Sequence, residues 1–338
     1  LDISNTTIQD LAPISNVTFL EGLNLSNTPT TAIKFIKYAD RLQDLNLSNT
    51  QIEDISELVN LVSLRVLRAE KTPIQSFAAL NQFKSLKGLY LGESGFNNME
   101  NIKDLTNLEV LSLNKSFILN FSFLSQLTAL RDLDLAQTNC TDLSPLASLS
   151  ELTFLDVTST QISDLSLIAP LTKLKKIRAD KTNLSSEGAI LFVQNHPNIL
   201  LIHHVEDLQT WWENLSFSWK NALKKNNPSL EGDKPEIESL TETLTLKSLS
   251  LDSAGIENLN PIVRFISLAT LDFSNNSHVD NLLPLQEVKT LKNLTAKNTG
   301  IQEIGSLKGN VLLERMDMEG SPVSSIKDLM RLTEEFET

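Results

Sequence analysis

A leucine or isoleucine returns every 22 residues through more than half of the chain, and polar residues fill the intervals in a repeating order. Each of these positions lies in the phrase L-x-x-L-x-L-x-x-T-x-I, as in residues 42–52 and 152–162. A fixed period with this leucine spacing is the signature of a solenoid, in which successive coils stack on one another. The positions that define the period are Leu1, Leu23, Leu45, Leu67, Leu89, Leu111, Leu133, Leu155 and Ile177.

The L-x-L part of the phrase alternates in the manner of a short β-strand. Leu23 and Leu25 are predicted to point into the core, and Asn24 between them is predicted to point outward. Because stacking places equivalent segments of successive coils side by side, we expect these strands to pair in parallel and to form the inner wall of the solenoid.

A threonine or serine recurs three positions after most of the predicted strands. The backbone turns away from the strand there, and its buried polar groups need hydrogen-bond partners. We therefore interpret these hydroxyls as structural rather than catalytic. They belong to Thr6, Thr28, Thr50, Thr72, Ser94, Ser116, Thr138, Thr160, Thr182, Thr299 and Ser321.

The remainder of each coil carries the phrase D-L-x-P-L or a close variant, as in residues 10–14, 142–146 and 258–262. Asp or Asn can cap a short helical turn, and Pro fits the first positions of such a turn. A coil of 22 residues has room for 3₁₀ turns but not for a long helix. The predicted fold class is an α/β solenoid, a right-handed leucine-rich repeat superhelix with a parallel inner sheet and 3₁₀ or short turns on its convex side.

These 22-residue coils and their T-x-I-x-D-L-x-P-L phrase resemble the bacterial leucine-rich repeat family typified by the internalins. The resemblance covers nearly all of the chain outside residues 205–240. It is specific for the fold and implies no particular partner.

The period breaks after Ile177. Residues 185–193 are predicted to form a capped helix that Pro197 prevents from continuing, and the next strand is expected over residues 199–204. Residues 205–240 match no repeat, but their apolar residues fall at helical spacing. This stripe consists of Leu208, Trp211, Trp212, Leu215, Trp219, Ala222 and Leu223.

Two interpretations of the tryptophan stripe stay open. The first, which we favour, is a helix whose apolar face seals an open end of the solenoid, because an exposed end would aggregate. The second is an aromatic site for a ligand or partner.

The repeats resume at residues 246–251, which gives a predicted organisation in three parts. A solenoid of about ten coils covers residues 1–204, a helical interruption covers 205–240, and a second block of about four coils covers 241–338 and ends in a short helix over 326–338. The interruption either caps the first block and begins a second solenoid, or bulges from one continuous arc. We favour the first, since about 36 residues is far longer than an ordinary connection.

Composition narrows the class of partner. A hydrophobic content of 41% supports a continuous narrow core, whereas a net charge of −13 opposes nucleic acid or an anionic membrane surface as the main partner. No run of apolar residues approaches the roughly 18 needed for a membrane helix.

Because Leu1 opens inside a repeat, we expect the chain to be a trimmed or mature piece, and the sequence assigns it neither to the cell surface nor to the cytoplasm. We expect a monomer.

Side chains suited to catalysis do not gather in any recognised pattern. His203 and His204 are adjacent on a predicted strand and point to opposite faces, so they are poorly placed to share a metal. Cys140 is the single cysteine, which excludes an internal disulfide, and we interpret it as a semi-buried spacer in a turn. Phosphate-binding, serine-hydrolase and zinc-protease motifs are missing. We therefore predict no enzymatic activity, no metal and no cofactor.

The central, outward position of the predicted strands varies from coil to coil, while the framework around it barely changes. This is the division expected when packing fixes a scaffold and one face is free to recognise a ligand. The column reads Asp2, Asn24, Asn46, Arg68, Tyr90, Ser112, Asp134, Asp156, Arg178, His203, Ser250, Asp272, Thr295 and Asp317.

Basic residues cluster at residues 65–71 and again at 175–181, and the coils between them carry acidic and apolar side chains on the same face. Charged ends around a partly apolar, acidic middle suit a protein or peptide surface. The candidate binding residues on the concave face are Arg65, Arg68, Tyr90, Val110, Asp132, Asp134, Phe154, Asp156, Lys176 and Arg178.

The leading hypothesis is a non-enzymatic scaffold that binds a partner protein on its concave sheet. One alternative is a surface, cell-wall or carbohydrate-binding adhesion module, for which the concave face offers only the rings of Tyr90 and Phe154. A further alternative is an intracellular protein that resembles the regulatory subunits built from such repeats.

Overall fold

The computed structural model describes residues 1–17 and 19–324, and the chain divides into two compact units. The first comprises Leu1–Phe192 with Leu201–His203, and the second comprises Val193–Leu200 with the chain from His204 onward. The short helix expected over residues 326–338 lies outside the described residues.

Nine strands, arranged in sequence order, form one sheet, and the neighbours from β1 to β8 are parallel. Their central residues pair one coil on, as Leu45 does with Leu67 and Leu133 with Leu155. Asp2 adds a single parallel bridge to Asn24 before the first strand. The strands are β1 (Gly22–Asn24), β2 (Asp44–Asn46), β3 (Val66–Arg68), β4 (Gly88–Tyr90), β5 (Val110–Ser112), β6 (Asp132–Asp134), β7 (Phe154–Asp156), β8 (Lys176–Arg178) and β9 (Leu200–Ile202).

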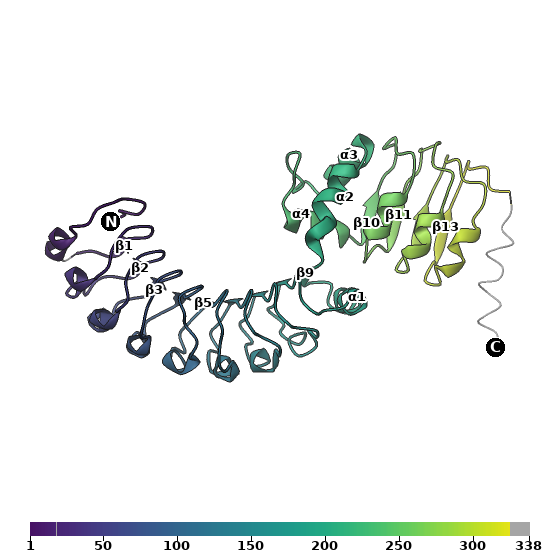
Figure 1. Cartoon of the computed structure of the whole chain (residues 1–338). Helices are drawn as coiled ribbons and strands as arrows, with labels where there is room; N and C mark the ends of the chain where they lie inside the picture. The colour runs from purple at the N-terminus through teal and green to yellow at the C-terminus, as the bar shows by residue number, and fades with distance from the viewer. Residues whose placement is uncertain (18, 325–338) are drawn as a thin grey trace. The chain divides into compact units, whose positions relative to one another are not determined.

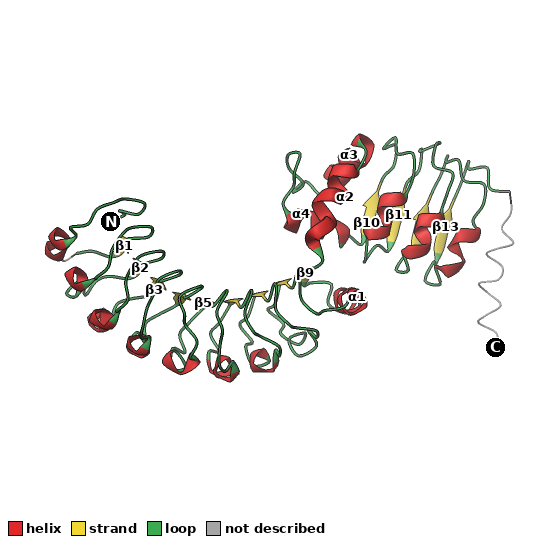
Figure 2. Ribbon diagram, viewed as in Figure 1, coloured by secondary structure: helices red, strands yellow, loops and turns green. Residues whose placement is uncertain are grey.

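Short 3₁₀ helices form the outer side of the first unit, and the strands line its inner side (Figures 1 and 2). In the last long coil an α-helix, α1 (Ser186–Asn195), takes their place. The predicted solenoid with a parallel inner sheet and a 3₁₀ outer side is therefore confirmed. The 3₁₀ helices are η1 (Ala12–Asn16), η2 (Lys34–Ile36), η3 (Ser56–Asn60), η4 (Ala78–Gln82), η5 (Met99–Asn101), η6 (Ser122–Gln126) and η7 (Ser144–Leu146).

The core of the first unit is a continuous column of aliphatic side chains. Leu45, Leu67 and Leu133 at the strand centres have no solvent exposure, while their strand neighbours are partly exposed. This is the alternation that the L-x-L phrase predicts. The side chains on either side of each buried leucine therefore face the inner side of the arc.

The recurring hydroxyls satisfy backbone groups in the turn after each strand, as expected. Thr28 Oγ1 donates to the Leu25 oxygen at 2.6 Å, and Thr160 Oγ1 donates to the Val157 oxygen at 2.6 Å. Ser116 is an exception, because its buried hydroxyl has no hydrogen-bond partner among the described residues. The neighbouring coil compensates in part: Asn139 Oδ1 accepts from the Ile118 nitrogen at 2.8 Å.

The turn also requires a left-handed residue, which the sequence did not reveal. One residue just before the hydroxyl position has a φ near +55°, as in Asn27 (56°), Lys71 (54°) and Glu93 (56°). Asn adopts this conformation more readily than other non-glycine residues. Because Lys, Glu, Gln and Ser also occupy the position, backbone hydrogen bonds of the stacked coils must hold it there.

In most coils an Asp or Asn opens the outer turn and fixes the start of the 3₁₀ helix, whereas Ala32 and Ser76 occupy this position before η2 and η4. Asp10 Oδ1 accepts from the Ala12 nitrogen at 3.0 Å, and Asp142 Oδ1 accepts from the Ser144 nitrogen at 2.9 Å. The side chain lies one residue before the helix cap and bonds the nitrogen two residues on. The expected capping role is confirmed in this form.

The second unit contains a parallel sheet of four strands, preceded by three α-helices (Figure 1). The strands are β10 (Ser248–Ser250), β11 (Thr270–Asp272), β12 (Asn293–Thr295) and β13 (Arg315–Asp317). The outer turns are η9 (Asn260–Arg264), η10 (Leu283–Glu287) and η11 (Gly305–Gly309). The helices are η8 (Val205–Asp207), α2 (Leu208–Asn214), α3 (Phe217–Asn226) and α4 (Ile237–Leu244).

The single helix expected along the tryptophan stripe is wrong. The chain leaves helical geometry at Leu215 and Ser216, and Ser216 caps a new helix by accepting from the Trp219 nitrogen at 3.3 Å. The serine favours this break because its side chain satisfies a nitrogen at the start of α3. A further helix, α4, extends the helical segment beyond residue 240.

Two of the three tryptophans are core residues of the second unit. Trp212 and Trp219 are buried in one cluster with Leu249 of β10 and Leu251, which directly follows this strand. Trp212 Nε1 donates to the Asp233 oxygen at 2.9 Å, and Trp219 Nε1 donates to the Asn258 oxygen at 3.0 Å. These helices thus cover the β10 end of the second unit and bury its apolar edge.

Candidate functional site

The candidate residues of the concave face gather around one hollow in the middle of the first unit. Its volume is about 470 Å³, and strands β3 to β7 contribute to its lining. Six of the ten predicted residues line it: Arg68, Tyr90, Val110, Asp132, Asp134 and Phe154. Of the other lining residues, Ser112 belongs to the outward column of the strands and Leu111 and Leu133 to the leucine period, whereas the sequence did not point to Glu70 and Asn114.

At one end of the hollow, Arg68 covers the ring of Tyr90. Its guanidinium carbon lies 5.0 Å from the ring centroid, and its Nη1 lies 2.9 Å from Oδ1 of Asp44. The register of β3 and β4 pairs these two residues directly, so neighbouring coils bring the cation and the ring together. The result is a fixed, partly apolar wall rather than a mobile charge.

At the other end, Lys176 covers Phe154 in the same way. Its Nζ lies 4.9 Å from the ring centroid, and β7 and β8 pair the two residues in register. The hollow is therefore enclosed by two aromatic side chains, each with a cation over one face.

Asp134 forms the acidic floor between these walls. Its Oδ2 accepts from Ser112 Oγ at 2.8 Å and from Asn114 Nδ2 at 3.0 Å, and its Oδ1 accepts from the Ala136 nitrogen at 2.9 Å. All three donors are neutral.

Part of the role of Asp134 is structural. Asn24 and Asn46 occupy the same position in their coils, and each accepts from the nitrogen two residues on at 3.0 Å. The turn after the strand therefore needs a side-chain oxygen at this position but not a negative charge. The acidic members of the variable column combine a turn bond, which the sequence did not reveal, with a charge that the turn does not require.

Two further carboxyl groups titrate abnormally on this face. Burial, assisted by the negative charge of Asp134, raises the pKa of Glu70 above its ordinary value. Burial also raises the pKa of Asp156, against hydrogen bonds from Thr158 that lower it. Asp156 pairs in register with Asp134, so like charges crowd this part of the sheet.

The remaining predicted residues lie outside the hollow. Arg65 precedes β3 and lines a separate hollow of about 670 Å³ on the flank, together with Lys87 and Glu109. Arg178 is exposed at the end of β8, in register with Asp156. The structure thus groups the aromatic and acidic candidates and separates Arg65 from them.

The residues that were missed occupy a second column, three positions after the strand centre of each coil. This column holds Ser in the first coils and then changes to Glu70, Gly92 and Asn114. The departure from a small hydroxyl residue was the available signal. A Cβ at Gly92 would overlap the side-chain amide of Asn114, so glycine lets that amide lie across the coil.

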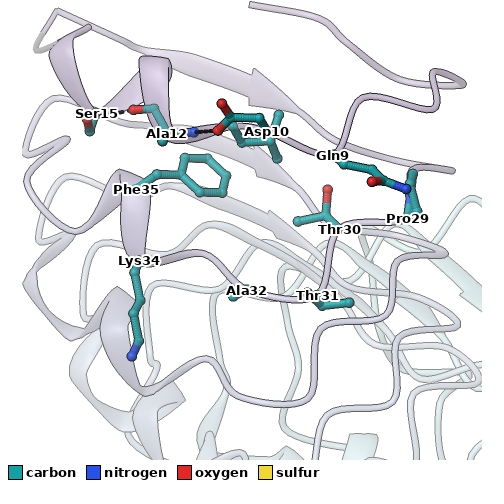
Figure 3. A pocket seen from close by; sticks show the side chains of 11 residues that line it. Gln9, Asp10, Ala12, Ser15, Pro29, Thr30, Thr31, Ala32, Lys34 and Phe35 are labelled. Atoms are coloured by element: carbon teal, nitrogen blue, oxygen red, sulfur yellow. Dashed lines mark hydrogen bonds between the residues drawn. The ribbon is translucent and has the colours of Figure 1, made fainter.

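A larger hollow, of about 700 Å³, lies between η1 and η2 on the outer side (Figure 3). Two of its polar groups are already engaged: Asp10 accepts from the Ala12 nitrogen, and Thr30 Oγ1 lies 2.7 Å from Thr28 Oγ1. We regard it as a gap between loosely packed outer turns, because its side chains do not converge on a common point.

The described residues contain no group of three or more His, Cys, Asp and Glu side chains placed to hold a metal ion. Burial raises the pKa of the Cys140 thiol to about 11, which leaves it a poor nucleophile. Within residues 1–17 and 19–324, no helix has the length and apolar character to cross a bilayer.

The coil geometry and the repeat phrase together define a leucine-rich repeat protein. No protein-family model and no curated protein matches the chain. Among solved structures, internalin C2 of Listeria monocytogenes is 31% identical, with 54% of this chain and 80% of that chain covered and a TM-score of 0.50. The chain belongs to the internalin-like family of bacterial leucine-rich repeat proteins.

Two other solved structures share the fold. Internalin F of Listeria monocytogenes is 19% identical over 97% of this chain and 76% of that chain, with a TM-score of 0.53. A leucine-rich repeat protein of Leptospira interrogans is 22% identical over 99% of this chain and 93% of that chain, with a TM-score of 0.54.

Proposed function

We propose that the first unit is a non-enzymatic scaffold that binds another protein on its concave sheet. The observation that carries this proposal is the hollow of about 470 Å³, in which half-buried Tyr90, Val110 and Phe154 are presented beside charged side chains. Aromatic side chains held rigidly by neighbouring coils are typical anchors of protein interfaces, because little conformational entropy is lost when they become buried.

The same geometry disfavours a sugar-binding surface. Sugar rings stack on exposed aromatic faces, but one face of Tyr90 is covered by Arg68 and one face of Phe154 by Lys176. The cation above each ring suits the mixed apolar and charged surface of a protein better than an uncharged sugar.

Site-specific photocrosslinking tests this proposal. A photoreactive phenylalanine analogue replaces Val110 in the hollow, and in a matched variant it replaces Val59, which is 38% exposed on outer turn η3. Both variants are irradiated in host or bacterial extracts, and adducts are identified by mass spectrometry. We expect a discrete protein adduct from position 110 that is missing from position 59. Equal adducts from both positions, or none from position 110, would contradict the concave-face assignment.

A further inference from the structure

The charge of the hollow is not balanced by its own residues. Three carboxylates line it, those of Glu70, Asp132 and Asp134, whereas the cations beside it are the guanidinium of Arg68 and the ammonium of Lys176, which lies over the ring of Phe154. That guanidinium is already held by Asp44, at 2.9 Å, on the side away from the acidic floor. The interior therefore carries excess negative charge between two apolar walls.

The acidic floor is also fixed in orientation. An ionised carboxylate offers about four acceptor directions, and Asp134 uses three of them for Ser112, Asn114 and the Ala136 nitrogen. Asp132 is less constrained, because the Thr153 hydroxyl that lies 3.2 Å from its Oδ1 also lies 3.0 Å from the Arg131 oxygen. A carboxylate that is preorganised and only partly satisfied favours an incoming cationic donor.

The turn does not explain the charge. Asn46 makes the same turn bond as Asp134, so an asparagine would satisfy the turn at this position. Burial and the neighbouring charge of Asp134 hold the pKa of Glu70 above its ordinary value, which a bound cation would reverse. The excess negative charge of the hollow and the fixed orientation of Asp134 thus both favour a positively charged ligand group.

We propose that this hollow receives a basic side chain of the partner protein, an arginine or a lysine, which inserts between Tyr90 and Phe154 and pairs with Asp134. The inference rests on the proposed function and adds the chemistry of its central contact. Arginine fits best, because its planar guanidinium can bond a carboxylate while its faces lie against aromatic rings.

The test is an NMR titration of the whole chain with N-acetyl-L-arginine amide as the probe, monitored through backbone amides. N-acetyl-L-citrulline amide, a neutral analogue of similar shape, is the ligand control. The protein variants are Asp134→Asn, which Asn46 shows to be compatible with the turn, and the matched control Asp54→Asn on the outer side.

For the wild-type chain and for Asp54→Asn, we expect saturable shifts at the amides of Asn114, Leu133 and Ala136, and no saturable shifts with citrulline. Asp134→Asn should weaken binding about tenfold, as expected when a hydrogen bond to a charged group is lost. Equal binding of citrulline, equal binding by Asp134→Asn, or no saturable shift would overturn the inference.

This outcome is separable from that of the crosslinking experiment. A partner that crosslinks at position 110 while the arginine probe fails to bind would overturn the inference and leave the proposed function intact. Saturable arginine binding without any adduct at position 110 would support the preference of the hollow for a basic group and count against the proposed function.

Discussion

The side-chain hydroxyls of Thr50 and Thr72 donate to the same backbone oxygen, that of Leu47, at 2.7 and 2.8 Å. The two threonines belong to successive coils, so one carbonyl group joins neighbouring turns of the solenoid. The second unit repeats the arrangement, because Thr299 and Ser321 both donate to the Ala296 oxygen. The recurring Thr and Ser side chains, which we call the hydroxyl ladder, therefore join neighbouring coils as well as satisfying the turn within each coil.

Because two hydroxyls donate to one carbonyl oxygen, we expect their substitutions to have non-additive effects on the free energy of unfolding. Thr50→Val and Thr72→Val should each cost about 1 kcal/mol of unfolding free energy, since the other hydroxyl still reaches Leu47. The double variant leaves a buried acceptor without a side-chain donor, and should cost about 1–3 kcal/mol more than the sum. Chemical denaturation of the four proteins checks this cycle, and strict additivity would show that the two bonds are independent.

The aliphatic column predicts a large stability difference between two leucines of the same unit. Leu133 has no solvent exposure, whereas Leu119 is 68% exposed. Leu133→Ala should destabilise the chain by roughly 2–5 kcal/mol through lost burial and the cavity left behind. Leu119→Ala, the matched control, should change it by less than about 0.5 kcal/mol. Similar midpoints for the two variants in urea denaturation would refute the proposed core.

We expect replacement of Asp156 by a neutral residue to stabilise the folded chain, by an amount that depends on pH. Its pKa is raised in the folded chain by burial and by the charge of Asp134, so the ionised form is disfavoured in the native state. Asp156→Asn keeps the turn bond to the Thr158 nitrogen, as Asn46 does with Ser48, and removes this penalty.

The sign follows from the raised pKa. At pH 7 both folded and unfolded Asp156 are ionised and the native state bears the full penalty, so the variant should melt at a higher temperature. As the pH falls through the folded pKa, the native wild-type chain takes up a proton first and the difference should shrink. Melting curves between pH 7 and pH 3.5 test this, and a variant that is less stable at pH 7 would contradict it.

Cys140 provides a probe of the first unit. Its thiol is buried and its pKa is raised to about 11, so alkylation at pH 8 should be at least about a hundredfold slower in the native chain than in denaturant. Iodoacetamide labelling followed by mass spectrometry measures both rates. Rapid labelling of the native chain would place the thiol at the surface and contradict its role as a spacer.

The coil register, the strands and the hydroxyl ladder were predictable because one residue type recurs at each position. What was missed depends on contacts between coils that do not repeat. Asn276 replaces the hydroxyl residue in its coil and donates to the oxygens of Leu251 and Phe273, yet no periodic signal marks it. The break at Ser216 likewise interrupts an apolar stripe that is unbroken in sequence.

For the candidate site, the outward column of the strands located Tyr90 and Asp134, and the positions beside it gave Asp132 and Phe154, but neither located the hollow itself. The hollow depends on where long side chains fold, and this is set by neighbours such as Gly92, whose missing Cβ makes room for Asn114. Arg65 was grouped with Arg68 by sequence proximity, but it precedes the strand and lies on the flank. The residue spacing within a coil does not distinguish the flank, which carries Arg65, from the concave face, which carries Arg68.

The most direct test of the concave-face proposal is the affinity of the crosslinked partner for two triple variants, measured by surface plasmon resonance. One carries Tyr90→Ala, Phe154→Ala and Arg178→Ala, and the control carries Val59→Ala, Lys103→Ala and Phe123→Ala, which removes a matched cation–ring pair from the outer side. We expect the concave variant to lose at least about a hundredfold in affinity, as for aromatic and arginine anchors. The control should bind like the wild-type chain. Equal affinity of the two variants would contradict the account.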